Sequence, residues 1–261
     1  MIRRPPRSTL SSSSAASDVY KRQGYETCIV PATGKVNINV EGLKFDSIGQ
    51  RVKNVWDGEP EGVYIPTGLE TEFLCTSKET EVFIAGAKFD KVLKPFSVHA
   101  DEIDMIQYGS DNTKTHRKIK HILGTKYNGK VGRLLVSELF TVGEGGWSGF
   151  PSHKHDTERL PDETLHNEIY NFRFTPEKGF GIQLLQPDGD KVGEAFHLVN
   201  GSTFAFNAGY HPCVVAPGYE MYYFTILGGL SQRSLVQYFQ PEHAYQIETI
   251  PGIKDMIAKY K

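Results

Sequence analysis

Short segments that alternate between apolar and polar residues, each ending at turn residues, fill the chain after residue 24. Residues 36–40 (VNINV) alternate strictly, and the segments 62–68 and 81–85 are similar strand–turn units. A second series begins at 134–142 and continues through the segments 168–174, 180–186, 202–206 and 222–227. Side chains of a strand alternate between its two faces, and regularly spaced short strands are typical of antiparallel sandwiches and barrels. The sequence therefore predicts an all-β fold.

One helix is predicted, near the end of the chain. The apolar residues that follow Pro251-Gly252 fall at positions i, i+3, i+4 and i+7, the spacing of one helix face: Ile253, Met256, Ile257 and Tyr260. We expect a short amphipathic helix that packs on the surface of the β structure and has no further role.

Residues 1–23 differ in composition from everything that follows. They are rich in Ser and Arg, show no apolar periodicity and lack the apolar run of a secretory signal. The string resembles translated sequencing-adapter sequence, so we expect a disordered leader that is foreign to the fold. It carries five positive residues and one negative residue, so the formal net charge of −2 for the whole chain becomes −6 for residues 24–261.

Composition and charge exclude several classes of protein. With 39% hydrophobic and 23% charged residues over 261 positions, the chain is neither disordered nor fibrous. No apolar run approaches the roughly 18 residues of a membrane span, and the weakly acidic charge offers no basic surface for nucleic acid or membranes. Cys28, Cys75 and Cys213 are far apart and form no CxxC pair, which favours reduced thiols in a cytoplasmic protein.

The strongest functional signal is the tripeptide His153-Lys154-His155. Residues two apart in a strand point to the same side, so the two imidazoles should converge while Lys154 points away. Glu168 and His211 are two further candidates at plausible distances along the chain. Three neutral imidazoles and one carboxylate would hold a divalent metal ion and leave coordination positions open for a substrate.

Glu168 begins a strand whose other residues of the same parity are large and ring-bearing: Tyr170, Phe172 and Phe174. This face should therefore be buried, where a lone carboxylate is costly unless a cation accompanies it. His166 shares this parity and is the main rival ligand. Because it follows the polar stretch 161–164, we expect it to lie in a loop.

The spacing of these motifs resembles the cupin superfamily. Gly146, the two histidines and Glu168 match a first cupin motif, and Gly201, Gly209 and His211 match a second, with Asn207 where the family usually has Pro. The resemblance implies a bicupin, that is, two tandem double-stranded β-helix (jelly-roll) barrels. No HxH precedes 62–68, so the expected order is a degenerate half without metal at 24–97, a connection at 98–130, the metal-binding barrel at 131–245 and a helical tail at 246–261.

Longer tracts are similar to one cupin family, the 5-deoxy-glucuronate isomerases of myo-inositol breakdown. These tracts are 146–156 (GWSGFPSHKHD), 168–173 (EIYNFR), 179–183 (GFGIQ), 209–212 (GYHP) and 217–223 (PGYEMYY). Members of that family carry several dozen residues before the position equivalent to Gly24, so the resemblance implies that the chain is truncated at its N-terminus.

The resemblance implies an aldose–ketose isomerase that converts 5-deoxy-D-glucuronate to 5-dehydro-2-deoxy-D-gluconate. It implies one divalent metal ion, zinc by analogy, although Mn, Fe and Ni also suit a His-rich site. The expected partner is a small sugar acid, with no nucleic acid and no membrane, and a homo-oligomer is left open because barrels of this kind often associate through sheet edges.

The sequence does not identify the proton-transferring base. Tyr170, Gln183 and Tyr223 are candidates to line the pocket as acid–base groups or hydroxyl donors. Lys154, Arg173 and Arg233 are candidates to bind the substrate carboxylate, although strand parity directs Lys154 and Arg173 away from the side of Glu168.

Three rival functions stay open at this stage. The nearest is the ketol-isomerase that acts on 4-deoxy-L-threo-5-hexosulose uronate from pectin. The others are an Fe²⁺-dependent cupin dioxygenase and a non-catalytic sugar-binding cupin. The long tract at 147–156 favours the inositol enzyme over its pectin counterpart.

Overall fold

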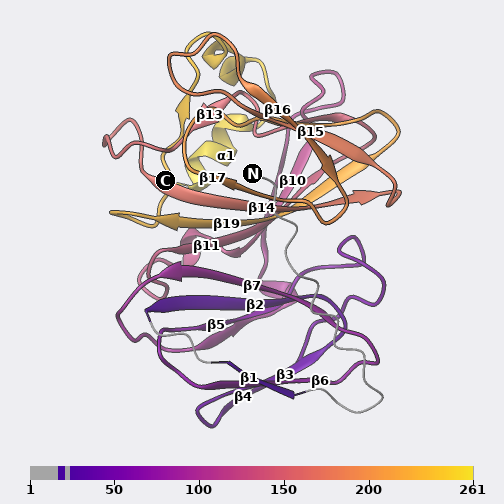
Figure 1. The fold of residues 1–261 in the computed structure, drawn as a ribbon, viewed down its shortest axis with the longest axis vertical. Coiled ribbons are helices and arrows are strands. Elements are labelled where there is room, and N and C mark those ends of the chain that lie inside the picture. The colour runs from indigo at the N-terminus through magenta and orange to yellow at the C-terminus, as the bar shows by residue number, and fades with distance from the viewer. Residues whose placement is uncertain (1–16, 21–23, 261) are drawn as a thin grey trace. The chain divides into compact units, whose positions relative to one another are not determined.

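The computed structural model describes residues 17–20 and 24–260, and most of its regular structure is β-strand (Figure 1). This confirms the all-β fold that the alternating segments predict. Among the helices of the described residues, none has the length and apolar character that crossing a bilayer requires.

The described chain divides into two compact units. The N-terminal unit comprises residues 17–20, 24–104 and 120–136, and the C-terminal unit comprises residues 105–119 and 137–260. The unit boundaries fall inside three strands, β9 (Asp104–Tyr108), β10 (Arg117–Leu123) and β11 (Leu134–Thr141).

The strands of the N-terminal unit are β1 (Ser17–Tyr20), β2 (Tyr25–Thr33), β3 (Val36–Val40), β4 (Leu43–Ile48), β5 (Gly62–Ile65), β6 (Thr71–Cys75), β7 (Glu81–Lys88) and β8 (Phe96–Val98). They form two four-stranded sheets, in the orders β1-β6-β3-β4 and β7-β2-β5-β8. Two short 3₁₀ turns, η1 (Ala100–Glu102) and η2 (Thr125–Tyr127), complete the unit.

An aliphatic core fills the N-terminal unit. Val36, Ile38 and Val40 of β3 are buried, while the two asparagines between them are partly exposed. Because strand side chains alternate between faces, this burial is the one that the VNINV pattern predicts. The three residues pack in one cluster with Ile29, Ile48, Val63, Ile65 and Phe73.

The further strands of the C-terminal unit are β12 (Gly146–Ser148), β13 (His153–Lys154), β14 (His166–Thr175), β15 (Phe180–Leu185), β16 (Glu194–Val199), β17 (Thr203–Phe206), β18 (Cys213–Val215), β19 (Glu220–Gly229) and β20 (Tyr238–Phe239). The sheets have the orders β17-β14-β19-β11-β10-β9, β12-β18-β15-β16 and β13-β20. A 3₁₀ turn, η3 (Ala244–Glu248), precedes the helix α1 (Ile253–Tyr260).

Strand β14 carries the clearest alternation in the C-terminal unit. Its residues of even number, from His166 to Phe174, are buried, and those of odd number are exposed or partly exposed. It lies between β17 and β19, with Glu168 opposite Phe206 on one side and Leu227 on the other. The predicted burial of the Glu168 face is therefore confirmed, and the face that carries this carboxylate is lined by aromatic rings.

Three expectations differ from the structure. Residues 98–130, expected to be an irregular connection, contain β9, β10 and two 3₁₀ turns, because β10 pairs between β9 and β11 in a six-stranded sheet. Of the leader 1–23, expected to be disordered, Ser17–Tyr20 forms β1 and pairs antiparallel with β6, and the rest lies outside the described residues. Helix α1 occurs as predicted, with Ile253 and Met256 buried, but Met256 lines a pocket rather than merely covering the barrel.

Candidate metal centre

His153, His155 and His211 converge on one point inside the C-terminal unit. One ring nitrogen from each lies within 4.8 Å of the others, and all three side chains are buried. His153 is held in the two-residue strand β13, where it pairs with Phe239 of β20, and Lys154 pairs with Tyr238. The parity argument for the HxH tripeptide is therefore correct: the two histidines meet and the lysine between them does not join them.

Backbone carbonyl groups fix the orientation of all three rings. The Nδ1 atoms of His153, His155 and His211 lie 3.1, 2.9 and 2.8 Å from the carbonyl oxygens of Pro151, His166 and Gly209. A carbonyl oxygen only accepts hydrogen bonds, so each Nδ1 carries the proton and donates it. In a neutral ring the Nε2 lone pair is then free for a ligand, which is the usual arrangement of metal-binding histidines.

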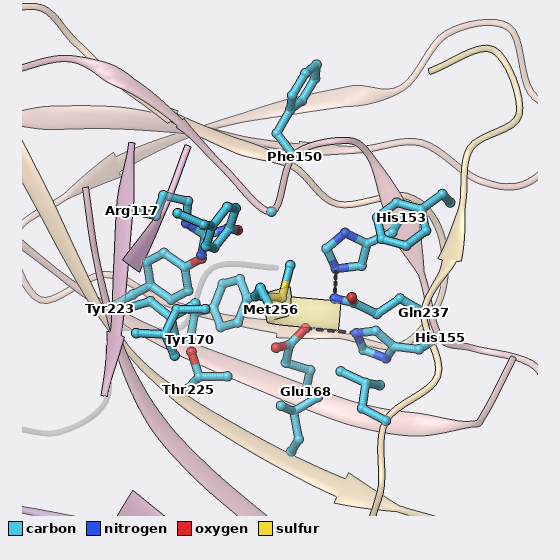
Figure 2. A pocket seen from close by; sticks show the side chains of 17 residues that line it. Arg117, Phe150, His153, His155, Glu168, Tyr170, Tyr223, Thr225, Gln237 and Met256 are labelled. Atoms are coloured by element: carbon cyan, nitrogen blue, oxygen red, sulfur yellow. Dashed lines mark hydrogen bonds and ion pairs between the residues drawn. The ribbon is translucent and has the colours of Figure 1, made fainter. Parts of the chain in front are cut away.

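Glu168 completes the cluster from β14. Its Oε2 atom lies 3.0 Å from Nε2 of His155 and 3.2 Å from Nε2 of His211. Burial by itself would raise the pKa of Glu168, but the hydrogen bonds and positive charge of these two histidines hold it well below its usual range. Glu168 is therefore an anion, and Figure 2 shows it directed at His155.

Their surroundings shift the pKa values of His153 and His155 in opposite directions. Burial, together with the nearby rings of His211 and His155, lowers the pKa of His153 well below its ordinary value, so this ring is neutral. Burial also disfavours the charged form of His155, yet the contact with Glu168 outweighs it and raises the pKa of His155.

A glycine and two side-chain hydrogen bonds fix the turn that carries His211. Gly209 has φ +95°, and a Cβ atom there would lie 2.7 Å from the carbonyl oxygen of Gln186, so glycine suits both the conformation and the space. The Gly209 amide donates to Oδ2 of Asp156 at 2.6 Å, which ties this turn to the residue after His155. The Nε2 amide of Gln183 donates to the His211 carbonyl at 2.8 Å.

The four side chains fit a divalent metal ion. Once an ion displaces any proton on Nε2, three imidazole nitrogens and one carboxylate oxygen form a mixed N/O donor set of the kind that Zn²⁺, Mn²⁺, Fe²⁺ and Ni²⁺ accept. Nε2 of His211 is buried and lies 3.2 Å from Oε2 of Glu168, so this nitrogen and the carboxylate oxygen are close enough to bind one ion.

A pocket opens beside this cluster. His153, His155 and Glu168 line it together with Tyr170, Tyr223, Thr225 and Arg117, and the apolar side chains of its wall include Phe150, Leu235, Phe239 and Met256 (Figure 2). Polar groups that converge at the end of a largely apolar cavity are typical of small-molecule sites.

Sequence comparison places this site in a known family. The sequence model of the KduI/IolB family matches residues 8–246. The chain belongs to the KduI/IolB family. A curated relative, 5-deoxy-glucuronate isomerase from Bacillus subtilis (strain 168), is 30% identical over 240 residues, which are 92% of this chain and 85% of the relative. The protein of the same name from Geobacillus thermodenitrificans (strain NG80-2) is 32% identical over 228 residues, 86% of this chain and 79% of the relative.

Solved structures agree with this assignment. The crystal structure of an IolB-like protein from Salmonella typhimurium LT2 has a TM-score of 0.81 and 25% identity, covering 89% of this chain and 86% of that one. Oxalate decarboxylase from Lactobacillus farciminis has a TM-score of 0.61 at 8% identity, covering 92% of this chain and 80% of that one. The second likeness concerns the fold alone, and together they confirm the predicted bicupin fold of this KduI/IolB chain.

The three residues suggested as pocket groups have different places. Tyr170 and Tyr223 line the pocket, with their ring centroids 4.4 Å apart. Gln183 does not line it, because its side chain is directed at the carbonyl groups of Leu184, His211 and Pro212. Gln183 holds the turn that carries His211. Strand parity alone could not show whether its side chain faces this turn or the cavity.

None of the three cations suggested for the substrate carboxylate lines the pocket. Lys154 is buried, and its Nζ forms ion pairs with the carboxylates of Glu163 at 3.1 Å and Asp156 at 2.8 Å. Arg173 lies on the face of β14 opposite to Glu168. Arg233 is buried, and its carbonyl oxygen accepts a hydrogen bond from Nε2 of His166 at 3.2 Å.

His166 is the first residue of β14 and is buried, so the expectation of a loop is wrong. Its ring centroid lies 6.2 Å from that of His155, and burial lowers its pKa to about 4. It stands behind His155, whose Nδ1 donates to the His166 carbonyl. His166 is thus a neighbour of the cluster, and it contributes its backbone carbonyl oxygen rather than its ring.

Among the lining residues of the pocket that the sequence analysis did not identify are Arg117, Gln237 and Met256. The Nε2 amide of Gln237 donates to Nε2 of His153 at 2.9 Å (Figure 2). Arg117 and Ile119 share parity on β10 and both line the pocket, but residues 119–123 are all buried, so alternation within 117–123 does not mark Arg117. No pattern in the sequence marks Gln237.

Proposed function

We propose that this chain is a metal-dependent aldose–ketose isomerase that converts 5-deoxy-D-glucuronate to 5-dehydro-2-deoxy-D-gluconate. The observation that carries the proposal is the convergence of His153, His155 and His211, with Glu168 beside them, next to a pocket that His153, His155 and Glu168 line. Membership of the KduI/IolB family and relatives named 5-deoxy-glucuronate isomerase support the reaction and the substrate.

The four side chains are the proposed metal ligands. A divalent ion held by them would act as a Lewis acid toward the carbonyl and neighbouring hydroxyl of the open-chain sugar, which acidifies the hydrogen on the hydroxyl-bearing carbon. The reaction is an isomerisation: that hydrogen leaves as a proton and a proton is added at the former carbonyl carbon, while the hydroxyl oxygen loses a proton and the former carbonyl oxygen gains one, so no other reactant is consumed. We propose zinc as the ion, since its preference for imidazole ligands suits this site.

The tyrosines of the pocket are neutral hydroxyls rather than bases. Burial raises the pKa of Tyr170 and of Tyr223 well above the ordinary value, so both hydroxyls keep their protons at neutral pH. The apolar wall formed by Phe150, Leu235, Phe239 and Met256 keeps bulk water away from the reacting carbons.

The test is turnover of 5-deoxy-D-glucuronate by zinc-loaded protein in D₂O, followed by NMR. We expect a new ketone signal and deuterium at the carbon that was the aldehyde, because the proton that arrives there comes from solvent. Loss of substrate without a ketone, or no change in substrate at full metal occupancy, would overturn the proposal.

Two controls separate the rival functions. Turnover under strict anaerobic conditions excludes a dioxygenase, which consumes oxygen. A parallel assay with 4-deoxy-L-threo-5-hexosulose uronate measures preference for the pectin-derived substrate, and a higher kcat/KM for it would reassign the substrate. The cytoplasmic setting expected from the unpaired cysteines, and any self-association, stay predictions.

A further inference from the structure

Arg117 is a buried cation at the wall of the pocket. Its side chain is 3% exposed. Its NH1 and NH2 groups donate to the hydroxyls of Tyr108 at 2.8 Å and Tyr223 at 2.6 Å, and its Nε has no hydrogen-bond partner. In the described part of the chain it forms no ion pair.

The two tyrosines do not neutralise this charge. Burial raises the pKa of both hydroxyls more than the nearby guanidinium lowers it, so Tyr108 and Tyr223 are neutral. Their rings lie 5.6 and 5.9 Å from the guanidinium carbon, which offsets part of the cost of burying the cation. A guanidinium still has N–H groups beyond those that the hydroxyls accept, and a buried cation without an anion is costly.

Glu168 is the carboxylate that lines the same pocket, but it is already engaged. Its Oε2 contacts His155 and His211 at 3.0 and 3.2 Å. Figure 2 shows Arg117 and Tyr223 on one side of the pocket and the pair His153 and His155 on the other. The pocket therefore has an acidic, imidazole-rich end and a cationic end without an anion.

The cationic end also offers a hydroxyl donor. The Tyr108 oxygen accepts from Arg117, and no acceptor for its own proton lies among the described residues. The Tyr223 hydroxyl, by contrast, also contacts Oγ of Ser148 at 2.6 Å. A planar guanidinium beside a free O–H is an arrangement that matches the two oxygens of a carboxylate.

We infer that Arg117, assisted by the Tyr108 hydroxyl, binds the carboxylate of the sugar-acid substrate and so determines specificity for acids over neutral sugars. This inference rests on the proposed function, because it places the reacting carbonyl at the histidine cluster and the carboxylate at the opposite end. It also assigns to Arg117 the task for which the sequence analysis named Lys154, Arg173 and Arg233 as candidates.

The experiment compares an acid and a neutral substrate in matched variants. 5-Deoxy-D-glucose has the same aldehyde and hydroxyl as 5-deoxy-D-glucuronate but CH₂OH in place of the carboxylate. We expect Arg117→Met to lower kcat/KM for the acid by about 100-fold or more, as for loss of one partner of a buried charge pair. For the neutral sugar we expect a change of less than about threefold.

Two further variants keep the test decisive. Tyr108→Phe retains the ring beneath the guanidinium and should lower kcat/KM for the acid alone, by about tenfold. Lys118→Met removes the neighbouring cation, which lies on the other face of β10 against Phe140 at 5.0 Å, and should leave both substrates unaffected. Metal content and melting temperature identify any variant that misfolds.

Equal losses for acid and neutral sugar in Arg117→Met and Tyr108→Phe would assign Arg117 a purely structural role and overturn the inference. Binding without turnover separates this result from failure of the proposed function. By calorimetry, wild-type protein should bind D-glucuronate more tightly than D-glucuronamide, and Arg117→Met should abolish the difference. That pattern in a protein that isomerises neither sugar would sustain the carboxylate site and reject the reaction, whereas no acid–amide difference in the wild type would reject the site.

Discussion

Each histidine of the cluster holds its position through Nδ1, while its Nε2 faces another polar group of the site, Gln237 for His153 and Glu168 for His155 and His211. The Nδ1 atoms are directed at backbone carbonyls from three different segments of the chain, so the rings are oriented before any ion arrives. Preorganised ligands lose little freedom on binding, which favours high affinity and a defined geometry.

Removal of either of two ligands should release the metal. We expect His153→Ala and His211→Ala each to lower zinc affinity by more than the roughly 10–100-fold that outer-sphere substitutions cost. His197→Ala is the matched control, because His197 is exposed on β16. Competition with a chromophoric chelator measures the affinity, and full metal retention by both variants would disprove the ligand assignment.

Tyr127 provides a pH-dependent prediction at one residue of the N-terminal unit. Burial, with a smaller effect of Glu102, raises the pKa of Tyr127 to about 12. An unfolded tyrosine releases its proton near pH 10, about two units lower. The unfolded state therefore gains from deprotonation first, so the contribution of Tyr127 to stability is complete below about pH 10 and is lost between about pH 10 and 12.

The Tyr127 hydroxyl is buried and has no hydrogen-bond partner among the described residues. Tyr127→Phe should thus unfold at the same urea concentration as wild type at pH 8, and should lose less stability at pH 11. Urea midpoints at the two pH values give the answer. A parallel decline of both proteins at pH 11 would argue against the prediction.

At the scale of elements, β14 contributes residues both to the core and to the proposed metal site. Its buried face begins with His166 and Glu168 and continues through Tyr170, Phe172 and Phe174. The ring of Phe172 lies 5.4 Å from that of Tyr223, which lines the pocket. The strand therefore supplies a proposed ligand at one end and packing at the other.

Replacing a large side chain on the buried face of β14 by alanine should destabilise the folded protein. We expect Phe172→Ala to lower the free energy of unfolding by about 3–5 kcal/mol, because Phe172 is fully buried and its removal leaves a cavity. Ile169→Ala, on the opposite face of the same strand and 40% exposed, should cost less than about 1 kcal/mol. Urea denaturation followed by tryptophan fluorescence compares them, and similar losses would contradict the assignment of the buried face.

Elements whose burial follows from their own alternation were predictable from the sequence, and elements buried by distant partners were not. Period-two patterns predicted β3 and β14 and the convergence of His153 with His155. Strand β10 is rich in cations, and only its pairing in the sheet buries Arg117. Likewise, α1 was predictable as an amphipathic helix, but which cavity Met256 lines depends on tertiary packing.

At the scale of the whole molecule, the proposed metal ligands belong to the C-terminal unit. The N-terminal unit has its own aliphatic core, formed by residues between Ile29 and Phe73. An ion that binds only the native state stabilises it by mass action. Its effect should therefore be largest where the ligands lie.

Metal removal should reveal this asymmetry by hydrogen exchange. We expect treatment with a chelator to increase exchange at 150–156, 166–170 and 209–213, and re-addition of zinc to reverse the change. Amides of β2 and β3 should exchange at nearly the same rate in both states. Equal deprotection of β2 and β3 would show that the ion stabilises the molecule globally.

The position of β13 in the sequence affects when the pocket can form during synthesis of the chain. Its partner β20 lies more than eighty positions later, and Met256, which lines the same pocket as His153, comes later still in the sequence. During translation, His153 and His155 leave the ribosome long before Phe239 and Met256 exist. The pocket that these residues line can therefore be complete only after nearly the whole chain has been synthesised.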